Sequence, residues 1–173
     1  MTLRFARNQA ERVLRELRID RAPVDLKVVA EHLGLRIAHE QLGDGLSGAL
    51  VTHGEKAVVC VQASDHPHRK RFTIAHEIGH FVLRHQFEKG AHVIVDRGNL
   101  ISFRGHRASE GVDPKEIDAN HFAACLLMPE ALLFQAVDAL GGSLHDHDVE
   151  NLARTFQVSE QAMTLRLGRL GLL

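Results

Sequence analysis

Apolar residues recur every three or four positions at the start of the chain, with Arg and Glu between them. These apolar positions are Ala6, Ala10, Val13, Leu14 and Leu17. The spacing predicts an amphipathic helix that ends near Ile19. A second, shorter helix is predicted over residues 26–33, with Gly34 placed to end it. We interpret both helices as packing elements without catalytic side chains.

Three stretches after Gly34 are typical of β-strands. Residues 35–39 alternate between apolar and polar, whereas residues 46–51 and 56–61 are mostly apolar. The turn at residues 52–55 predicts that the last two stretches form a hairpin. We therefore expect a small antiparallel sheet in this part of the chain.

Helical patterns dominate the remaining sequence. Residues 71–83 predict a helix that can be buried along its length, preceded by capping residues and a proline at 64–67. Another helix is predicted over residues 116–128, opened by Asp113 and stopped by Pro129. Residues 149–156 and 161–170 predict two helices joined by a short turn. We expect a domain over residues 1–142, with a helix-turn-helix-like segment over residues 143–173 packed on it.

Composition and charge narrow the class of protein. The chain has 173 residues, 45% of them hydrophobic, which is enough to support the core of one ordinary domain. Its net charge is −1 and it has no basic block, so we expect no direct nucleic-acid binding, including by the C-terminal helices. No signal peptide or membrane span is recognisable. Cys60 and Cys125 form no CxxC motif, and we expect buried thiols in a cytoplasmic protein.

The strongest chemical signal is the H-E-x-x-H motif from His76 to His80. Residues four apart lie on one face of a helix, so His76 and His80 can bind one metal ion. Glu77 can then act as general base on a water at the metal. Gly79 costs the helix about 1 kcal/mol relative to Ala, which predicts that another backbone or the ligand sphere comes close there. The alternative is a pair of surface histidines. We interpret His66, His68 and His85 as surface residues, because none has helical spacing to the pair.

A zinc site with two histidines needs a third protein ligand and keeps a position for water. Glu116 and Asn120 are polar residues four apart on the predicted helix 116–128, whose core face is apolar. Glu116 can be the third ligand, and Asn120 can orient a ligand imidazole. The alternative is that Glu116 is an exposed first-turn residue favoured by the helix dipole.

Two further regions are candidates for substrate contact. An exposed sheet edge can bind an extended peptide as an additional strand, and we expect residues 45–50 to form that edge. The irregular stretch 88–114 predicts a second hairpin over residues 91–95 and 100–104, and it connects the two helices of the metal site. Its residues Arg97, Arg104 and Arg107 are candidates for substrate contact, with a solvated loop as the alternative.

The motifs together resemble the ImmA/IrrE-type metallo-endopeptidases. The resemblance rests on residues 71–80, on Glu116-x-x-Ala119-Asn120-x-Phe122-Ala123 and on residues 126–129, and it extends from about Pro23 to the end. It implies a minimal zincin-like α+β fold in which His76, His80 and Glu116 bind Zn²⁺, with Mn²⁺ as the alternative, and Glu77 is the catalytic base. It also implies the substrate, a helix-turn-helix (Xre-like) repressor in a phage, stress-response or toxin–antitoxin-like context.

The motifs do not identify the group that stabilises the oxyanion. The chain has no Tyr, so the group that stabilises the oxyanion must be His, Arg or backbone. His121 and His106 are the candidates for this role. A non-catalytic module that sequesters a repressor or toxin is the alternative function, and peptide deformylase is the alternative enzyme with the same motif.

Overall fold

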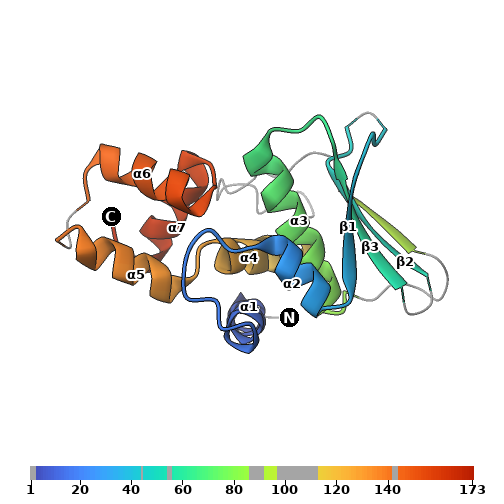
Figure 1. Ribbon diagram of the computed structural model, residues 1–173, viewed down its shortest axis with the longest axis horizontal. Helices are drawn as coiled ribbons and strands as arrows, with labels where there is room; N and C mark the ends of the chain where they lie inside the picture. The colour runs from blue at the N-terminus through green and yellow to red at the C-terminus, as the bar shows by residue number, and fades with distance from the viewer. Residues whose placement is uncertain (1–2, 44, 54–55, 86–91, 97–112, 142–143) are drawn as a thin grey trace.

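The computed structural model describes residues 3–43, 45–53, 56–85, 92–96, 113–141 and 144–173. Figure 1 shows the sheet at one end of the molecule and the C-terminal helices at the other end, with further helices between them. The elements in chain order are α1 (Leu3–Glu16), α2 (Leu26–His32), β1 (Leu35–Glu40), β2 (Gly48–His53), β3 (Lys56–Gln62), α3 (Pro67–Val82), β4 (His92–Asp96), α4 (Pro114–Leu127), α5 (Glu130–Ala139), α6 (Asp146–Phe156) and α7 (Glu160–Leu170). The expected α+β fold class is confirmed.

The sheet has the strand order β1-β3-β2-β4 and is mixed. β2 and β3 pair antiparallel from Gly48↔Val61 to His53↔Lys56, which confirms the predicted hairpin. β1 pairs with β3 in parallel, so the expectation of a wholly antiparallel sheet is wrong. The hairpin places β3, and not β2, beside β1. Since β2 runs opposite to both β1 and β3, the neighbouring strands β1 and β3 run in the same direction.

The expectation that residues 45–50 form a free sheet edge is also wrong. β4 pairs antiparallel with the other side of β2, from Gly48↔Asp96 to Thr52↔His92, so β2 is an inner strand. The first half of the predicted second hairpin is therefore present as β4. Its second half, residues 100–104, lies outside the described residues.

Local side-chain contacts explain where the two central helices begin. His66 precedes α3, and its Nδ1 accepts a hydrogen bond from the backbone N–H of His68 at 3.3 Å. Asp113 precedes α4, and its Oδ1 accepts from the backbone N–H of Lys115 at 2.9 Å. Each helix then starts with proline, which has no N–H to leave unpaired in the first turn.

Helix α3 is packed between the sheet and α4. It contacts β2 and β3 on one side and α4 on the other, while α1 packs against α4. A Cβ at Gly79 would lie 3.0 Å from Phe122 Cδ1 and 3.2 Å from the backbone oxygen of Ala119. The prediction that another backbone comes close at Gly79 is therefore confirmed, and this contact sets the spacing of the two helices.

Helices α6 and α7 confirm the two predicted C-terminal helices, whereas α5 was not predicted. Buried Phe156 and Leu167 belong to the same hydrophobic cluster as Phe122 of α4. Nε of the buried Arg166 donates to the backbone oxygen of Met128 at 3.2 Å. The C-terminal helices thus share a core with the rest of the chain, and the boundary at residue 142 stays a prediction.

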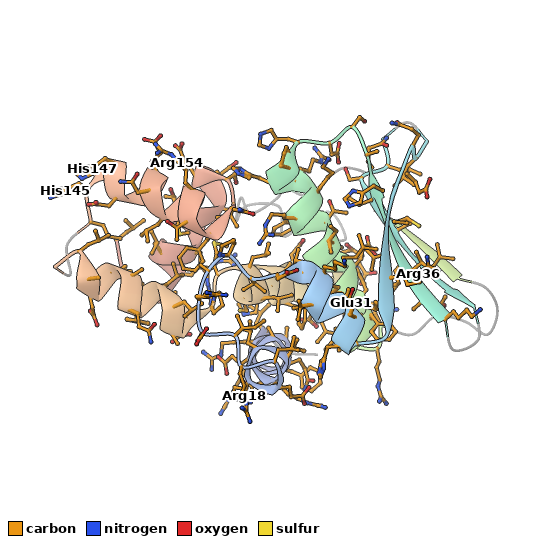
Figure 2. All side chains as sticks on the ribbon, viewed as in Figure 1. Arg18, Glu31, Arg36, His145, His147 and Arg154 are labelled. Atoms are coloured by element: carbon orange, nitrogen blue, oxygen red, sulfur yellow. The ribbon has the colours of Figure 1, made fainter. Side chains whose placement is uncertain are left out.

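The outer face of the C-terminal helices is polar. Figure 2 shows three labelled side chains, His145, His147 and Arg154, that project outward from α6 and from the residue before it. Within the described residues, no single helix is long and apolar enough to cross a membrane. α4 and α5 reach that length and composition only as a pair bent by 44°.

Candidate metal centre

Three side chains from α3 and α4 meet at one point. His76 Nε2 lies 2.9 Å from His80 Nε2, and Glu116 places Oε2 3.2 Å from His76 Nε2 and Oε1 3.3 Å from His80 Nε2. Ligand atoms about 2.0–2.1 Å from a tetrahedral Zn²⁺ are separated by about 3.3 Å. The three donors therefore fit one metal ion, and they form the one such His/Cys/Asp/Glu group found among the described residues.

The site is buried on the histidine side and opens at the glutamate. His76 and His80 are each 1% exposed, whereas the side chain of Glu116 is 38% exposed. Hydrogen bonds from His76 and then from His80 hold the pKa of the Glu116 carboxyl well below its usual range, although burial opposes this shift. Glu116 is thus an ionised carboxylate, the form that binds a metal.

Each histidine is oriented by a hydrogen bond at its other ring nitrogen. His76 Nδ1 lies 2.9 Å from Asn120 Oδ1. Because an amide oxygen only accepts, a proton belongs on His76 Nδ1. A bound metal would replace the hydrogen bond from Nε2 to Glu116 and would use the lone pair of that nitrogen. Asn120 therefore stands where the sequence predicted an imidazole-orienting residue.

His85 orients the imidazole of His80. The prediction that His85 is a surface residue is therefore wrong. It is 5% exposed, and its Nδ1 lies 2.9 Å from His80 Nδ1. Burial, followed by the neighbouring His80, lowers the pKa of His85 to about 4. A neutral His85 can accept the Nδ1 proton of His80 and leave His80 Nε2 free for the metal.

The turn at the end of α3 explains why helical spacing does not predict the contact between His85 and His80. Five residues along an uninterrupted helix would turn its side chain away from His80. Instead Arg84 has a left-handed φ of 51°, and the N–H of His85 bonds to the backbone oxygen of His80 at 3.2 Å. This C-terminal turn folds the chain back and returns His85 to the histidine pair.

Comparison with known proteins agrees with this geometry. A family model described as the IrrE N-terminal-like domain, of the peptidase M78 family, matches residues 30–168. The chain belongs to this family. Its members are metallopeptidases, so metal-dependent peptide hydrolysis is the general activity that membership supports. No curated protein matches the chain.

In this IrrE-like domain, the side chain of Glu77 lies on the side of α3 that faces the sheet. It is 0% exposed, and a Cβ built on Gly48 of β2 would lie 3.2 Å from its Oε1. The same Cβ would lie only 2.2 Å from Cγ2 of Thr73, one turn earlier on α3. The absence of a side chain at Gly48 therefore leaves the space that Thr73 and Glu77 occupy. Neither Gly48 nor Thr73 has a sequence pattern that predicts this contact.

Of the two candidates for oxyanion stabilisation, His121 lies within the described residues, and its polar contact is with Cys125 rather than with the ligand set. His121 lies on α4 with its Nε2 3.7 Å from Cys125 Sγ. Burial, followed by the nearby Arg166 of α7, lowers the pKa of His121 to about 4. This placement, toward the C-terminal helices, gives no support to a role in catalysis.

His106, Arg97, Arg104 and Arg107 lie outside the described residues.

Proposed function

We propose that this protein is a metal-dependent endopeptidase that binds Zn²⁺ through His76, His80 and Glu116. The observation that carries the proposal is the convergence of these three donors, with the buried carboxylate of Glu77 next to His76 on the same helix. A module that only bound a partner would need no carboxylate next to the ligand set. Family membership favours the peptidase over peptide deformylase, which shares only the H-E-x-x-H motif with this chain. Mn²⁺ is the alternative metal.

The chemistry divides between the metal and the residues around it. His76, His80 and Glu116 would hold a divalent metal, which would supply Lewis acidity to a water and to a peptide carbonyl. Glu77 accepts a proton from the attacking water and delivers it to the leaving nitrogen. The C–N bond breaks after the new C–O bond forms, and the products are a carboxylate and an amine. Asn120 and His85 hold the two imidazoles in the required tautomers.

The substrate we propose is a helix-turn-helix (Xre-like) transcriptional repressor, in a phage, stress-response or toxin–antitoxin-like context. The proposal rests on the resemblance carried by residues 71–80, 116–123 and 126–129. A cytoplasmic location is consistent with such a substrate. It is supported by Cys60 and Cys125, which are both free thiols. We propose no direct contact with nucleic acid.

A trapping experiment tests both the activity and the substrate. Glu77→Gln keeps the size of the side chain but cannot take up the proton, so the variant is expected to hold substrate without cutting it. Partners captured from the native host by this variant are then incubated with the wild type and Zn²⁺ or Mn²⁺. Glu160→Gln is the matched control, because Glu160 is exposed on α7.

The outcomes separate the two functional classes. A captured helix-turn-helix protein that the wild type and Glu160→Gln cut at one site, and Glu77→Gln leaves intact, supports a dedicated regulatory protease. A partner that all three proteins bind and leave intact contradicts the proposal and supports sequestration. Cleavage by Glu77→Gln at the wild-type rate would show that Glu77 is not the base.

A further inference from the structure

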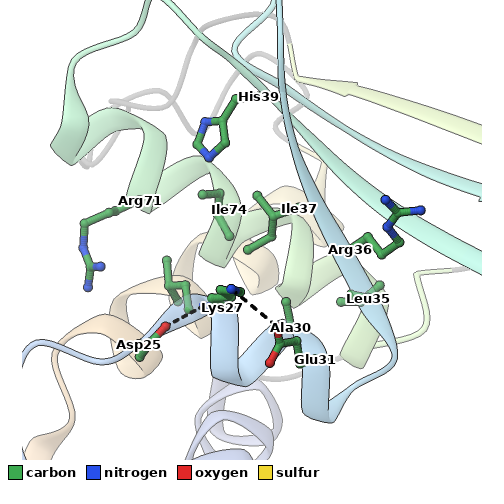
Figure 3. Close-up of a pocket in the computed structure, with 11 residues that line it drawn as sticks. Asp25, Lys27, Ala30, Glu31, Leu35, Arg36, Ile37, His39, Arg71 and Ile74 are labelled. Atoms are coloured by element: carbon green, nitrogen blue, oxygen red, sulfur yellow. Dashed lines mark hydrogen bonds and ion pairs between the residues drawn. The ribbon is translucent and has the colours of Figure 1, made fainter.

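A groove of about 530 Å³ lies between α2, β1 and α3. Figure 3 shows Ile37 of β1 and Ile74 of α3 pointing toward one another across it. Its apolar lining consists of Leu26, Ala30, Leu35, Ile37 and Ile74. On α3, Arg71 and Ile74 lie away from the face of His76 and His80, because these positions are about 120–180° apart around a helix. The groove is therefore separate from the metal centre.

The groove reaches an open edge of the sheet. β1 is the first strand in the order β1-β3-β2-β4 and is paired only with β3 among the described strands. Consecutive strand residues point to opposite faces of a sheet, yet Leu35, Arg36 and Ile37 all line the groove. The groove thus passes around the outer edge of β1, where backbone groups can pair with an added strand.

The groove has excess positive charge. Its two carboxylates are engaged: Asp25 Oδ1 accepts the backbone N–H of Lys27 at 2.9 Å, and Glu31 lies 3.9 Å from Lys27 Nζ. Neither Arg36 nor Arg71 has a carboxylate within 4.0 Å in the described part of the chain.

Arg71 is the more buried of these two arginines. Its Nη2 donates to the backbone oxygen of Val24 at 2.9 Å, its Nε is buried without a partner in the described structure, and burial lowers its pKa. The charge of Asp25 partly opposes this shift, but no carboxylate lies within 4.0 Å of Arg71 among the described residues. A partly desolvated cation without a close ion pair favours an anionic ligand. Figure 3 shows Arg71 on the α3 side of the groove and Arg36 extending from the other side of β1, so charge complementarity favours a ligand with more than one carboxylate.

We propose that this groove is a docking site for an extended acidic segment of the protein substrate. The segment adds to the outer edge of β1 as a further strand, places an apolar side chain between Ile37 and Ile74, and sets carboxylates against Arg36 and Arg71. This inference rests on the proposed function, because it assumes a protein substrate. It gives the enzyme a second contact with that substrate, away from the reacting bond.

The test uses full-length Glu77→Gln protein and a fluorescent eight-residue peptide of glutamate with valine at positions 3 and 5. Both faces of the extended peptide then carry carboxylates, and one face also carries the valines. Binding is measured by fluorescence anisotropy, and the bound site is mapped by amide chemical shifts. We expect the shifts at β1 and the N-terminal half of α3. The charge reversal Arg36→Glu is expected to weaken binding about tenfold or more, since it replaces attraction by repulsion. Arg71→Gln, which keeps a donor for the oxygen of Val24, is expected to weaken binding in the same direction.

Two controls make the result specific. Arg21→Glu makes the same change of charge on an exposed residue outside the groove, and it is expected to bind the peptide as the parent does. A peptide with lysine in place of glutamate is expected not to bind. Shifts at other elements, equal binding by Arg36→Glu, or equal affinity for free glutamate would each overturn the proposal.

The experiments distinguish a failure of the docking-site proposal from a failure of the proposed peptidase function. If the wild type cuts a captured repressor while the acidic peptide does not bind, the groove proposal alone is wrong. If the peptide binds at β1 while no captured partner is cut, the docking site stands and the proposed peptidase function is wrong.

Discussion

Gly48→Ala is the substitution that best tests how the catalytic base is positioned. The added Cβ would lie 2.2 Å from Thr73 Cγ2, 3.2 Å from Glu77 Oε1 and 3.4 Å from the backbone oxygen of Cys60. Non-bonded carbons approach to about 3.5–4.0 Å, so the Thr73 contact is more than about 1 Å too short. Thr73 and Glu77 are both 0% exposed, and neither side chain can move into solvent.

The expected cost follows from this overlap. Extra methyl groups in a well-packed core destabilise proteins by about 1–3 kcal/mol. In a chain of this size that cost lowers the melting temperature by roughly 2–4 °C per kcal/mol. If α3 shifts to relieve the overlap, Glu77 moves with it, and a displacement of about 1 Å at a catalytic group can reduce turnover about 100-fold. Metal content should stay near that of the wild type, because the ligands face α4.

A second substitution isolates the cause. Thr73→Ser removes Cγ2, the atom of the shortest contact, so the double variant Gly48→Ala/Thr73→Ser should recover stability relative to the sum of the two single changes. The coupling free energy from thermal or urea unfolding should lie in the range of about 0.5–3 kcal/mol for residues in contact. Recovery of kcat in the double variant would show that the overlap had displaced Glu77.

The control glycine is in α7. A Cβ at Gly168 meets nothing within 4 Å, so Gly168→Ala should be neutral or should stabilise the helix by up to about 1 kcal/mol. The reasoning is refuted if Gly48→Ala is as stable and as active as the wild type. It is also refuted if Thr73→Ser and Gly48→Ala are simply additive.

Three further predictions concern the histidines and the metal. His85→Ala should weaken metal binding by about 10–100-fold, because it removes the partner of His80 Nδ1; metal titration against His147→Ala, an exposed histidine on α6, checks this. Glu116→Gln should keep the fold but lose most of the rise in melting temperature that Zn²⁺ gives the wild type, since a ligand that binds the folded state stabilises it. A rise equal to that of the wild type would exclude Glu116 as a ligand. Because the pKa of His121 is lowered to about 4 in the fold, protonation favours the unfolded chain, where histidine titrates near 6.5. Stability should therefore fall as pH drops from about 6.5 toward 4. His121→Gln should flatten that slope in urea unfolding measured at several pH values, and an unchanged slope would contradict this reasoning.

Most of the secondary structure could be predicted from the chain alone, because it follows from short-range patterns. The helices α1, α2, α3, α4, α6 and α7 and the strands β1, β2 and β3 lie where periodicity and turn residues placed them. Capping at His66 and Asp113 was visible for the same reason, since a cap involves residues two or three apart. Helix α5 follows Pro129 directly and was missed, because its start has no capping side chain.

Residue spacing within single helices also predicts most of the metal-site residues. Four-residue spacing places His76 with His80 on α3, and Glu116 with Asn120 on α4, each pair on one helical face. The side of the helix occupied by Glu77 follows from the same geometry. These relations need only a helix, and they hold wherever that helix packs.

Tertiary structure decided what lies against these faces. The close crossing of α3 and α4 at Gly79 brings Glu116 to within 3.3 Å of both histidines, and pairing with β4 turns β2 into an inner strand. The left-handed Arg84 returns His85 to the metal centre, against its helical spacing. Such contacts join residues that are distant in the chain or that follow a break in periodicity. Their energy depends on packing of the whole fold, and local sequence patterns do not encode it.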